Sequence, residues 1–137
     1  TVDKFIGDAV MAVFGAPLLQ ADHALRAVRT GLGIVKAVAK LNESRPGMPA
    51  LRVRVAINSG SVLAGDVGSG KRLEYTVLGD VVNIASRMES SVAQPNQVVV
   101  SRAVLDRLTE PVPTRPLGAM QLRGRTASVE VFALEEP

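Results

Sequence analysis

The sequence predicts an α+β domain, an α/β sandwich with a mostly antiparallel sheet of the split βαβ kind. Short apolar segments with strand-like alternation occur before, between and after two amphipathic helical segments. At 137 residues and 47% hydrophobic content, the chain is long enough to build the core of one domain. Its longest apolar stretch, residues 9–19, is broken by Gly15 and Pro17 and is shorter than the roughly 20 residues of a membrane-spanning helix.

The first expected elements are two short strands, residues 1–5 and 9–14, joined as a hairpin by a turn in which Gly7 supplies a positive φ. Asp22 is the expected N-cap of a helix that runs to about Asn42. Apolar residues recur three and four positions apart along one stripe of this helix. That stripe is expected to face the core, and it consists of Leu25, Val28, Leu32, Val35 and Ala39.

The rest of the chain alternates strands with shorter helices. A loop rich in proline and glycine precedes a strand at residues 51–57, in which apolar residues alternate with arginines. Asp80 is expected to cap a helix to about residue 91, and Ser101 to cap a small helix to residue 108. A proline-rich connection then runs through Pro116. The remaining strands are expected at residues 61–66, 72–77, 97–100, 120–123 and 128–134.

The composition narrows the classes of partner. A net charge of +3 suits both the phosphates of a nucleotide and a nucleic-acid backbone. Aromatic residues are only 3% of the chain and Tyr75 is its single tyrosine, so we expect no nucleic-acid partner, because stacking platforms are missing. The chain has no cysteine, which excludes disulfides and favours a reducing, cytoplasmic location, although a parent protein can be tethered to a membrane elsewhere.

Two segments place charged and polar residues at regular spacing among apolar ones. The first is Lys4-Phe5-Ile6-Gly7-Asp8-Ala9-Val10-Met11-Ala12-Val13-Phe14-Gly15, in which a lysine and an aspartate bracket the hairpin turn. The second is Tyr75-Thr76-Val77-Leu78-Gly79-Asp80-Val81-Val82-Asn83-Ile84-Ala85-Ser86-Arg87-Met88. In this order they resemble the patterns K-x-x-G-D-x-x-M-x-x-F-G and Y-T-V-x-G-D-x-V-N-x-A-S-R of the class III nucleotidyl cyclases.

This resemblance implies that residues 1–137 are a class III adenylate cyclase catalytic domain with a ferredoxin-like core, lacking its first strand and helix. Such domains pair head to tail as dimers and convert a nucleoside triphosphate to a 3′,5′-cyclic monophosphate and pyrophosphate. The chain starts without methionine and within a predicted strand. We therefore expect it to be a fragment of a longer protein. We also expect it to be inactive by itself, because it lacks the second carboxylate of the family's two-metal site.

Asp8 follows a glycine at the hairpin turn, where its carboxylate can project beyond the sheet edge and bind a hard cation. The resemblance implies that Asp8 is one of two aspartates holding two Mg²⁺ or Mn²⁺ ions, which activate the ribose 3′-hydroxyl and neutralise the departing phosphates. The second aspartate of the family lies on a strand upstream of this sequence. Asp3 does not replace it, because Asp3 adjoins Lys4 and neighbouring strand residues point to opposite faces.

Lys4 and Thr76 match the two positions that select the purine base in the family. In adenylate-specific members the lysine donates to the adenine ring, and a threonine or aspartate accepts from the exocyclic amine. ATP is therefore the expected substrate, and a guanylate cyclase is disfavoured. Arg123 lies where the family commonly has a lysine that binds the triphosphate, and Arg125 can share this role.

Asn83 and Arg87 are four residues apart, so they lie on one face of the predicted helix while apolar residues cover the other. A solvent-facing polar stripe would show the same pattern. The resemblance implies instead that Asn83 orients the ribose and that Arg87 stabilises the charge on phosphorus in the transition state. A planar, permanently charged guanidinium suits that role because it can bond two phosphate oxygens.

Other interpretations compete with catalysis. Residues 65–72 come close to a P-loop but lack the serine or threonine after Lys71 and precede a predicted strand instead of a helix. We expect a glycine-rich hairpin turn there. The stronger alternative is a cyclase-homology domain that binds nucleotide or forms a homodimer or heterodimer without catalysis. A plain interaction module is a third, which nucleotide-dependent thermal stabilisation would distinguish from both.

Overall fold

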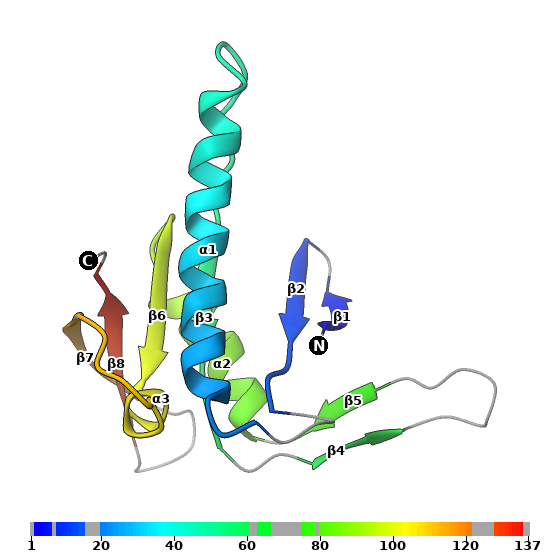
Figure 1. Cartoon of the computed structure of the whole chain (residues 1–137), viewed down its shortest axis with the longest axis vertical. Helices are drawn as coiled ribbons and strands as arrows, with labels where there is room; N and C mark the ends of the chain where they lie inside the picture. Colours follow the sequence, from blue (N-terminus) through cyan, green and yellow to red (C-terminus); the bar gives the residue numbers. More distant parts are fainter. Residues whose placement is uncertain are drawn as a thin grey trace.

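The computed structural model describes residues 2–6, 8–15, 20–60, 63–66, 75–78, 80–121 and 128–135. Within these residues the strands form a four-stranded sheet and two separate two-stranded ones (Figure 1). The large sheet has the order β3-β6-β8-β7. Its members are β3 (Arg54–Ile57), β6 (Gln97–Ser101), β7 (Thr114–Gln121) and β8 (Ser128–Leu134). The β3–β6 pair is parallel and the other pairs are antiparallel, which confirms the predicted mixed, mostly antiparallel sheet.

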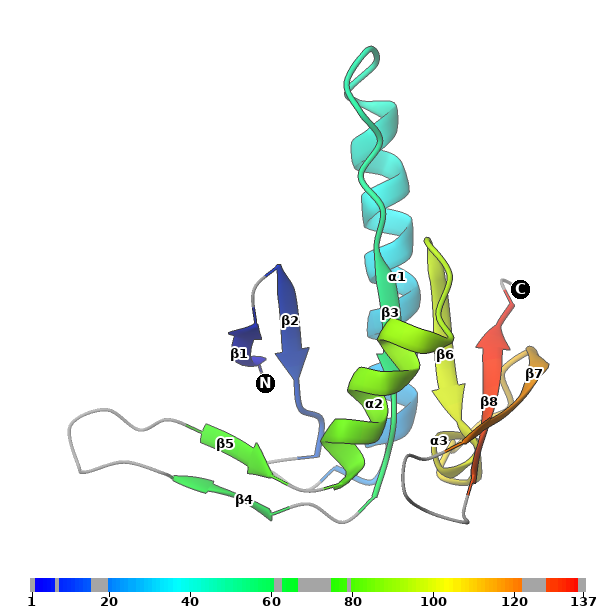
Figure 2. The same cartoon turned by 180° about the vertical axis from the view of Figure 1, so that it is seen from behind.

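Helices cover both faces of this sheet. Helix α1 (His23–Glu43) lies on the face turned toward the viewer in Figure 1, and α2 (Asp80–Ser91) lies on the opposite face, as Figure 2 shows. The short helix α3 (Arg102–Asp106) follows β6 directly. The result is a layered α+β architecture in which α2 is separated from α1 by the sheet.

The core is divided in two because successive residues of β6 point to opposite faces of the sheet. Val99 is completely buried among Met88 of α2, Met120 and Val131. Its neighbour Val100 is equally buried in a second cluster on the other face. That second cluster contains Ala24 and Val28 of α1, Val104 of α3 and Phe132 of β8.

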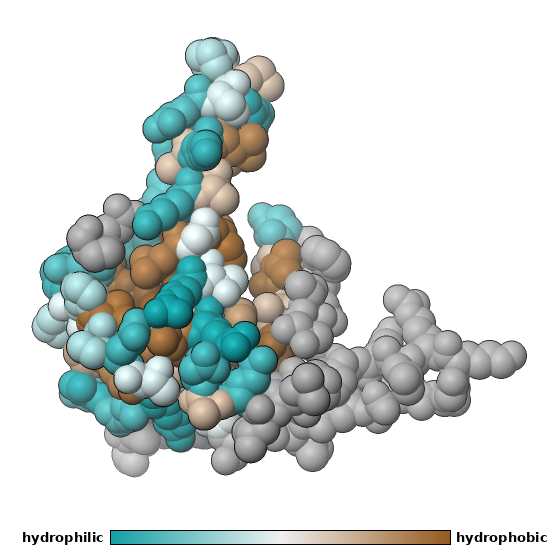
Figure 3. Space-filling model, in the orientation of Figure 1, coloured by the Kyte–Doolittle hydropathy of each residue, from teal (hydrophilic) through white to brown (hydrophobic). Residues whose placement is uncertain are grey.

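Only the first half of α1 packs on the sheet. Gly31 allows the close approach, since a Cβ there would lie 3.1 Å from a methyl carbon of Val98 and 3.3 Å from one of Val55. Beyond this point the helix extends away from the sheet (Figure 1), and the predicted buried stripe fails there, because Val35 is half-buried and Ala39 is exposed. The hydrophobic side chains exposed along this far half and the following loop are Ile34, Leu41, Met48 and Leu51, and Figure 3 shows apolar surface on the projecting helix.

Two hairpins stand beside the large sheet. In the first, β1 (Val2–Ile6) pairs antiparallel with β2 (Ala9–Ala12), as predicted. In the second, β4 (Leu63–Asp66) pairs antiparallel with β5 (Tyr75–Leu78). The residues between them, where the glycine-rich turn is expected and where the P-loop alternative was placed, lie outside the described residues.

Several local expectations were wrong for identifiable reasons. Strand β7 begins at Thr114, inside the expected proline-rich connection, because an edge strand tolerates Pro116, and the register shifts between Pro116 and Gly118, where φ is +104°. Strand β3 begins at Arg54 instead of residue 51. Asp22 and Ser101 occupy N-cap positions, but neither side chain makes a capping hydrogen bond. Asp22 instead pairs with Arg26 at 2.9 Å.

Candidate active site

Helix α2 carries Asn83 and Arg87 on the side away from the core. The helix is anchored by Met88, which is fully buried, while Asn83 is exposed and Arg87 is half-buried. Nη2 of Arg87 donates to the backbone oxygen of Gln121 at 3.3 Å, which directs the guanidinium toward the end of β7. The amphipathic pattern therefore leaves both polar side chains available to a ligand.

The β1–β2 hairpin carries Lys4 and Asp8. Lys4 is in β1, opposite Met11 of β2, and Asp8 is exposed in the turn directly before β2. The turn position follows from the sequence, because Asp8 lies between two short apolar strands. An exposed carboxylate at a hairpin turn can contribute oxygen ligands to a hard cation.

Thr76 lies in β5, opposite Gly65 of β4. Residues of β5 and β1 have Cα atoms within 8 Å of one another, so the strands that carry Thr76 and Lys4 are neighbours in space although about 70 residues separate them in the sequence. Arg123, the expected triphosphate ligand, lies outside the described residues, as does Arg125.

The chain's own acidic residues fit a metal site only in part. Among the described residues, no three histidine, cysteine, aspartate or glutamate side chains gather closely enough to hold a metal ion. Asp8 can offer one carboxylate, but a hard divalent cation needs several oxygen ligands. A two-ion site that uses Asp8 would need further oxygen ligands, which other carboxylates, backbone carbonyls, waters or substrate phosphates can supply.

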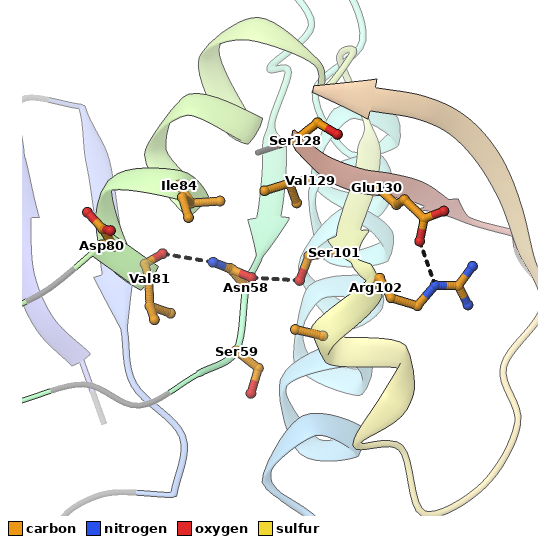
Figure 4. Close-up of a pocket in the computed structure, with 11 residues that line it drawn as sticks. Asn58, Ser59, Asp80, Val81, Ile84, Ser101, Arg102, Ser128, Val129 and Glu130 are labelled. Atoms are coloured by element: carbon orange, nitrogen blue, oxygen red, sulfur yellow. Dashed lines mark hydrogen bonds and ion pairs between the residues drawn. The ribbon is translucent and has the colours of Figure 1, made fainter. Parts of the chain in front are cut away.

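A shallow cleft of about 380 Å³ opens beside the first turn of α2 (Figure 4). Asn58, the first residue after β3, lies in its centre, and its side chain bonds to Ser101 at the end of β6 and to the backbone of Val81 in α2. On the far wall, Nε of Arg102 donates to Glu130 at 2.9 Å. Sequence reasoning missed Asn58, although a polar residue directly after an apolar strand and before Ser59-Gly60 was a usable signal.

Comparison with known proteins identifies the family. The chain belongs to the family of adenylate and guanylate cyclase catalytic domains, whose family model matches residues 3–136. The chain is 34% identical over 135 residues to Adenylate cyclase 1 of Rhizobium meliloti (strain 1021), an alignment that covers 96% of this chain and 20% of that protein. The chain thus spans about a fifth of the length of this relative and of the adenylate cyclase of Anabaena cylindrica.

Solved structures agree with this assignment. The guanylyl cyclase Cya2 matches with a TM-score of 0.88 and 33% identity, over 98% of this chain and 68% of that one. The adenylyl cyclase CyaB from P. aeruginosa matches with a TM-score of 0.85 and 27% identity, over 100% of this chain and 72% of that one. The predicted fold class and the resemblance to class III cyclases are confirmed. None of the described helices combines the length and apolarity needed to span a membrane.

Proposed function

We propose that this chain is part of an adenylate cyclase, which converts ATP to 3′,5′-cyclic AMP and pyrophosphate. The observation that carries the proposal is the display of Asn83 and Arg87 on the outer side of α2, in a chain of the cyclase family. Its curated relatives include proteins named adenylate cyclase, among them the one from Rhizobium meliloti. Its structural neighbours include a guanylyl cyclase as well, so membership in the family does not by itself select adenine or guanine.

The proposed choice of adenine depends on two side chains. The ammonium group of Lys4 only donates hydrogen bonds, which suits a ring nitrogen of adenine, and the hydroxyl of Thr76 can accept from the exocyclic amine. Guanine carries a hydrogen on the ring nitrogen N1, where adenine has an acceptor, so the Lys4 ammonium would meet another donor. The Thr76 hydroxyl can also donate to the guanine carbonyl, so the proposed discrimination depends mainly on Lys4. The proximity of β1 and β5 supports a shared base pocket for these residues.

The proposed reaction is an internal displacement at the α-phosphorus. The 3′-oxygen of the ribose attacks this phosphorus, the bond to the β-phosphate oxygen breaks, and the hydroxyl proton leaves to solvent or a base. Asn83 would orient the ribose, and Arg87 would stabilise the added negative charge on the phosphoryl oxygens. Arg123 would bind the triphosphate of ATP, of which the β- and γ-phosphates depart as pyrophosphate. Asp8 would contribute to holding two Mg²⁺ or Mn²⁺ ions, whose chemistry when bound is to activate the attacking oxygen and neutralise the leaving group.

We further propose that the site is complete only in a head-to-tail dimer, either of this protein with itself or with another cyclase domain. For each site, Asp8 would come from one subunit. The other subunit would supply the residues that bind ATP and act on it, which are Lys4, Thr76, Asn83 and Arg87. Strand β3 lies at the edge of the four-stranded sheet, because within the described residues it pairs with β6 alone. This open edge supports the proposal that another strand belongs beside it. A further strand paired with β3 would match the proposal that residues 1–137 lack the first strand and helix of the domain. We place the working enzyme in the cytoplasm, where ATP is available.

The test is an assay of the full-length protein with ATP and GTP side by side in the presence of Mn²⁺ or Mg²⁺. We expect cyclic AMP from ATP and little product from GTP. Lys4→Glu should lower ATP turnover and shift the ATP-to-GTP ratio by about tenfold or more, because a donor becomes an acceptor. Lys36→Glu, on the exposed side of α1, is the matched control. A preference for GTP in the unmutated protein would contradict the base assignment.

A non-catalytic cyclase-homology domain remains the alternative. It would be supported if ATP raised the melting temperature of the full-length protein while no cyclic product formed. Neither stabilisation nor turnover would instead favour a plain interaction module.

A further inference from the structure

The loop after β3 holds the first turn of α2 through a chain of two hydrogen bonds. Nδ2 of Asn58 donates to the backbone oxygen of Val81 at 3.1 Å, and the hydroxyl of Ser101 donates to Oδ1 of Asn58 at 2.6 Å. Figure 4 shows the amide of Asn58 between these two partners. The planar amide of Asn58 donates on one side and accepts on the other, which a carboxylate cannot do. The sequence separation is large, 23 residues to Val81 and 43 to Ser101.

Ser101 is buried, and its hydroxyl donates to Asn58. It is 1% exposed and occupies the N-cap position of α3, with extended backbone angles, φ −84° and ψ 165°. A serine at such a position ordinarily accepts from a backbone N–H of its own helix. Here it makes no capping bond, and its hydroxyl donates to Asn58 instead. The sequence therefore places a cap residue where its hydroxyl orients the Asn58 amide.

Gly60 packs closely against the same turn of α2, at the side chain of Val81. A Cβ on Gly60 would lie 2.7 Å from Cγ2 of Val81, closer than side chains can approach. The loop thus fixes the Val81 backbone through Asn58 and leaves room for the Val81 side chain at Gly60. Two independent contacts meet on one residue at the start of the helix.

The other end of α2 is attached to the same strand. Nη2 of Arg54, the first residue of β3, lies 2.9 Å from a carboxylate oxygen of Glu89 in the last turns of α2. Between these ends Met88 packs in the core, with Ala56 of β3 against the same cluster. Met88 and Glu89 hold the far end of the helix and Ile84 packs against the same core cluster, while Asn58 and Gly60 act on the first turn. Asn83 is two residues beyond Val81 and moves with it.

We propose that Asn58 is a positioning residue for this site, which sets the orientation of α2 and thereby the places of Asn83 and Arg87. This inference rests on the proposed function of those two residues. A displacement of about 1 Å at a reacting centre costs on the order of a hundredfold in rate. Asn58 contacts neither the substrate nor the reacting atoms in this account, and it acts through Val81.

The deciding experiment compares Asn58→Asp with Ser101→Ala in the full-length protein. A carboxylate at position 58 still accepts from Ser101 but cannot donate to Val81, whereas Ser101→Ala keeps the donor to Val81. We expect Asn58→Asp to lower kcat by about 10- to 100-fold with KM for ATP changed less than about threefold. Ser101→Ala should leave kcat within about threefold of the unmutated protein, while both variants lower the melting temperature because each disturbs a partly buried hydrogen bond.

Gly60→Ala tests the same positioning without touching Asn58. The added methyl group should displace Val81 and lower kcat, and the double variant Gly60→Ala/Val81→Ala should recover kcat because it removes the opposing methyl groups. Equal losses of kcat in Asn58→Asp and Ser101→Ala, in proportion to lost stability, would overturn the proposal. So would a Gly60→Ala variant with unchanged kcat.

The proposed function fails in a different way, by absence of ATP turnover in the unmutated protein. The positioning role is then judged by amide hydrogen exchange in the first turns of α2. Faster exchange there in Asn58→Asp than in Ser101→Ala supports it, and equal exchange in the two variants contradicts it.

Discussion

Helix α2 and the β1–β2 hairpin both carry proposed site residues, but the protein supports them very differently. Helix α2 is held by buried Met88, by the Arg54–Glu89 ion pair and by Asn58. The hairpin belongs to no larger sheet among the described residues, and Val10 in it is 59% exposed. Asn83 and Arg87 are therefore positioned by the core of their own chain, whereas the position of the Asp8 carboxylate depends on which element packs against the hairpin.

The largest effect is expected at Asp8. Replacing it with asparagine keeps the shape and removes the charge that a divalent ion needs, so cyclic AMP formation by the full-length protein should fall by about a thousandfold or more. Thermal unfolding should be unchanged, because Asp8 is exposed in a turn. Asp22→Asn, also on the chain surface, is the control. Activity within a few fold of the unmutated protein would contradict the metal role.

Arg87→Ala should lower kcat by about 10²- to 10³-fold, the typical cost of losing a group that stabilises charge in the transition state. The matched control is Arg107→Ala, directly after the end of α3, whose guanidinium also donates to a backbone oxygen, at 2.9 Å. Parallel kinetics and thermal melts separate catalysis from stability. Equal kcat in the two variants would remove Arg87 from the reaction.

The two regions should also differ in stability. Met88→Ala should cost about 2–5 kcal/mol of unfolding free energy, because it opens a cavity in a fully buried position. Val10→Ala should change it by less than about 0.5 kcal/mol, since that side chain is largely exposed. Urea unfolding of both variants measures this. A large loss from Val10→Ala would show that another element covers the hairpin.

The smallest effects are expected in α1, where one glycine packs against the sheet and another does not. Gly31→Ala should destabilise by about 1–3 kcal/mol, because its methyl group would press on Val98 and Val55. Gly33→Ala meets nothing within 4 Å and should stabilise the helix by about 0.5–1 kcal/mol. The pair of melts has opposite expected signs. Stabilisation by Gly31→Ala would show that α1 does not approach the sheet this closely in solution.

Local patterns predicted most of the fold. The hairpins, the helix that ends at Ser91 and strand 128–134 follow from periodicity and turn residues, which act over a few positions. The far half of α1 could not be predicted, because burial depends on which element lies opposite, and the stripe itself does not change at Val35. Strand β7 was missed because proline is excluded from central strands but not from edges.

The site residues also differ in whether local sequence or distant contacts determine their positions. Asn83 and Arg87 were placed correctly on one face of α2, because helical spacing fixes that from sequence. Asn58 was missed because its partners are far along the chain and no periodicity records them. The contact between β1 and β5 was likewise invisible without tertiary structure, and Arg123 stays a prediction because it lies outside the described residues.

In the proposed dimer one subunit supplies Asp8 and the other supplies Arg87 to each site, and mixing two mutant proteins tests this division. Full-length Asp8→Ala and Arg87→Ala proteins, each inactive alone, are mixed in equal amounts and allowed to exchange subunits. Half of the dimers are then mixed and carry one intact site of two, so cyclic AMP formation should return to about a quarter of the unmutated level. No recovery, with heterodimers shown to form, would contradict the composite site.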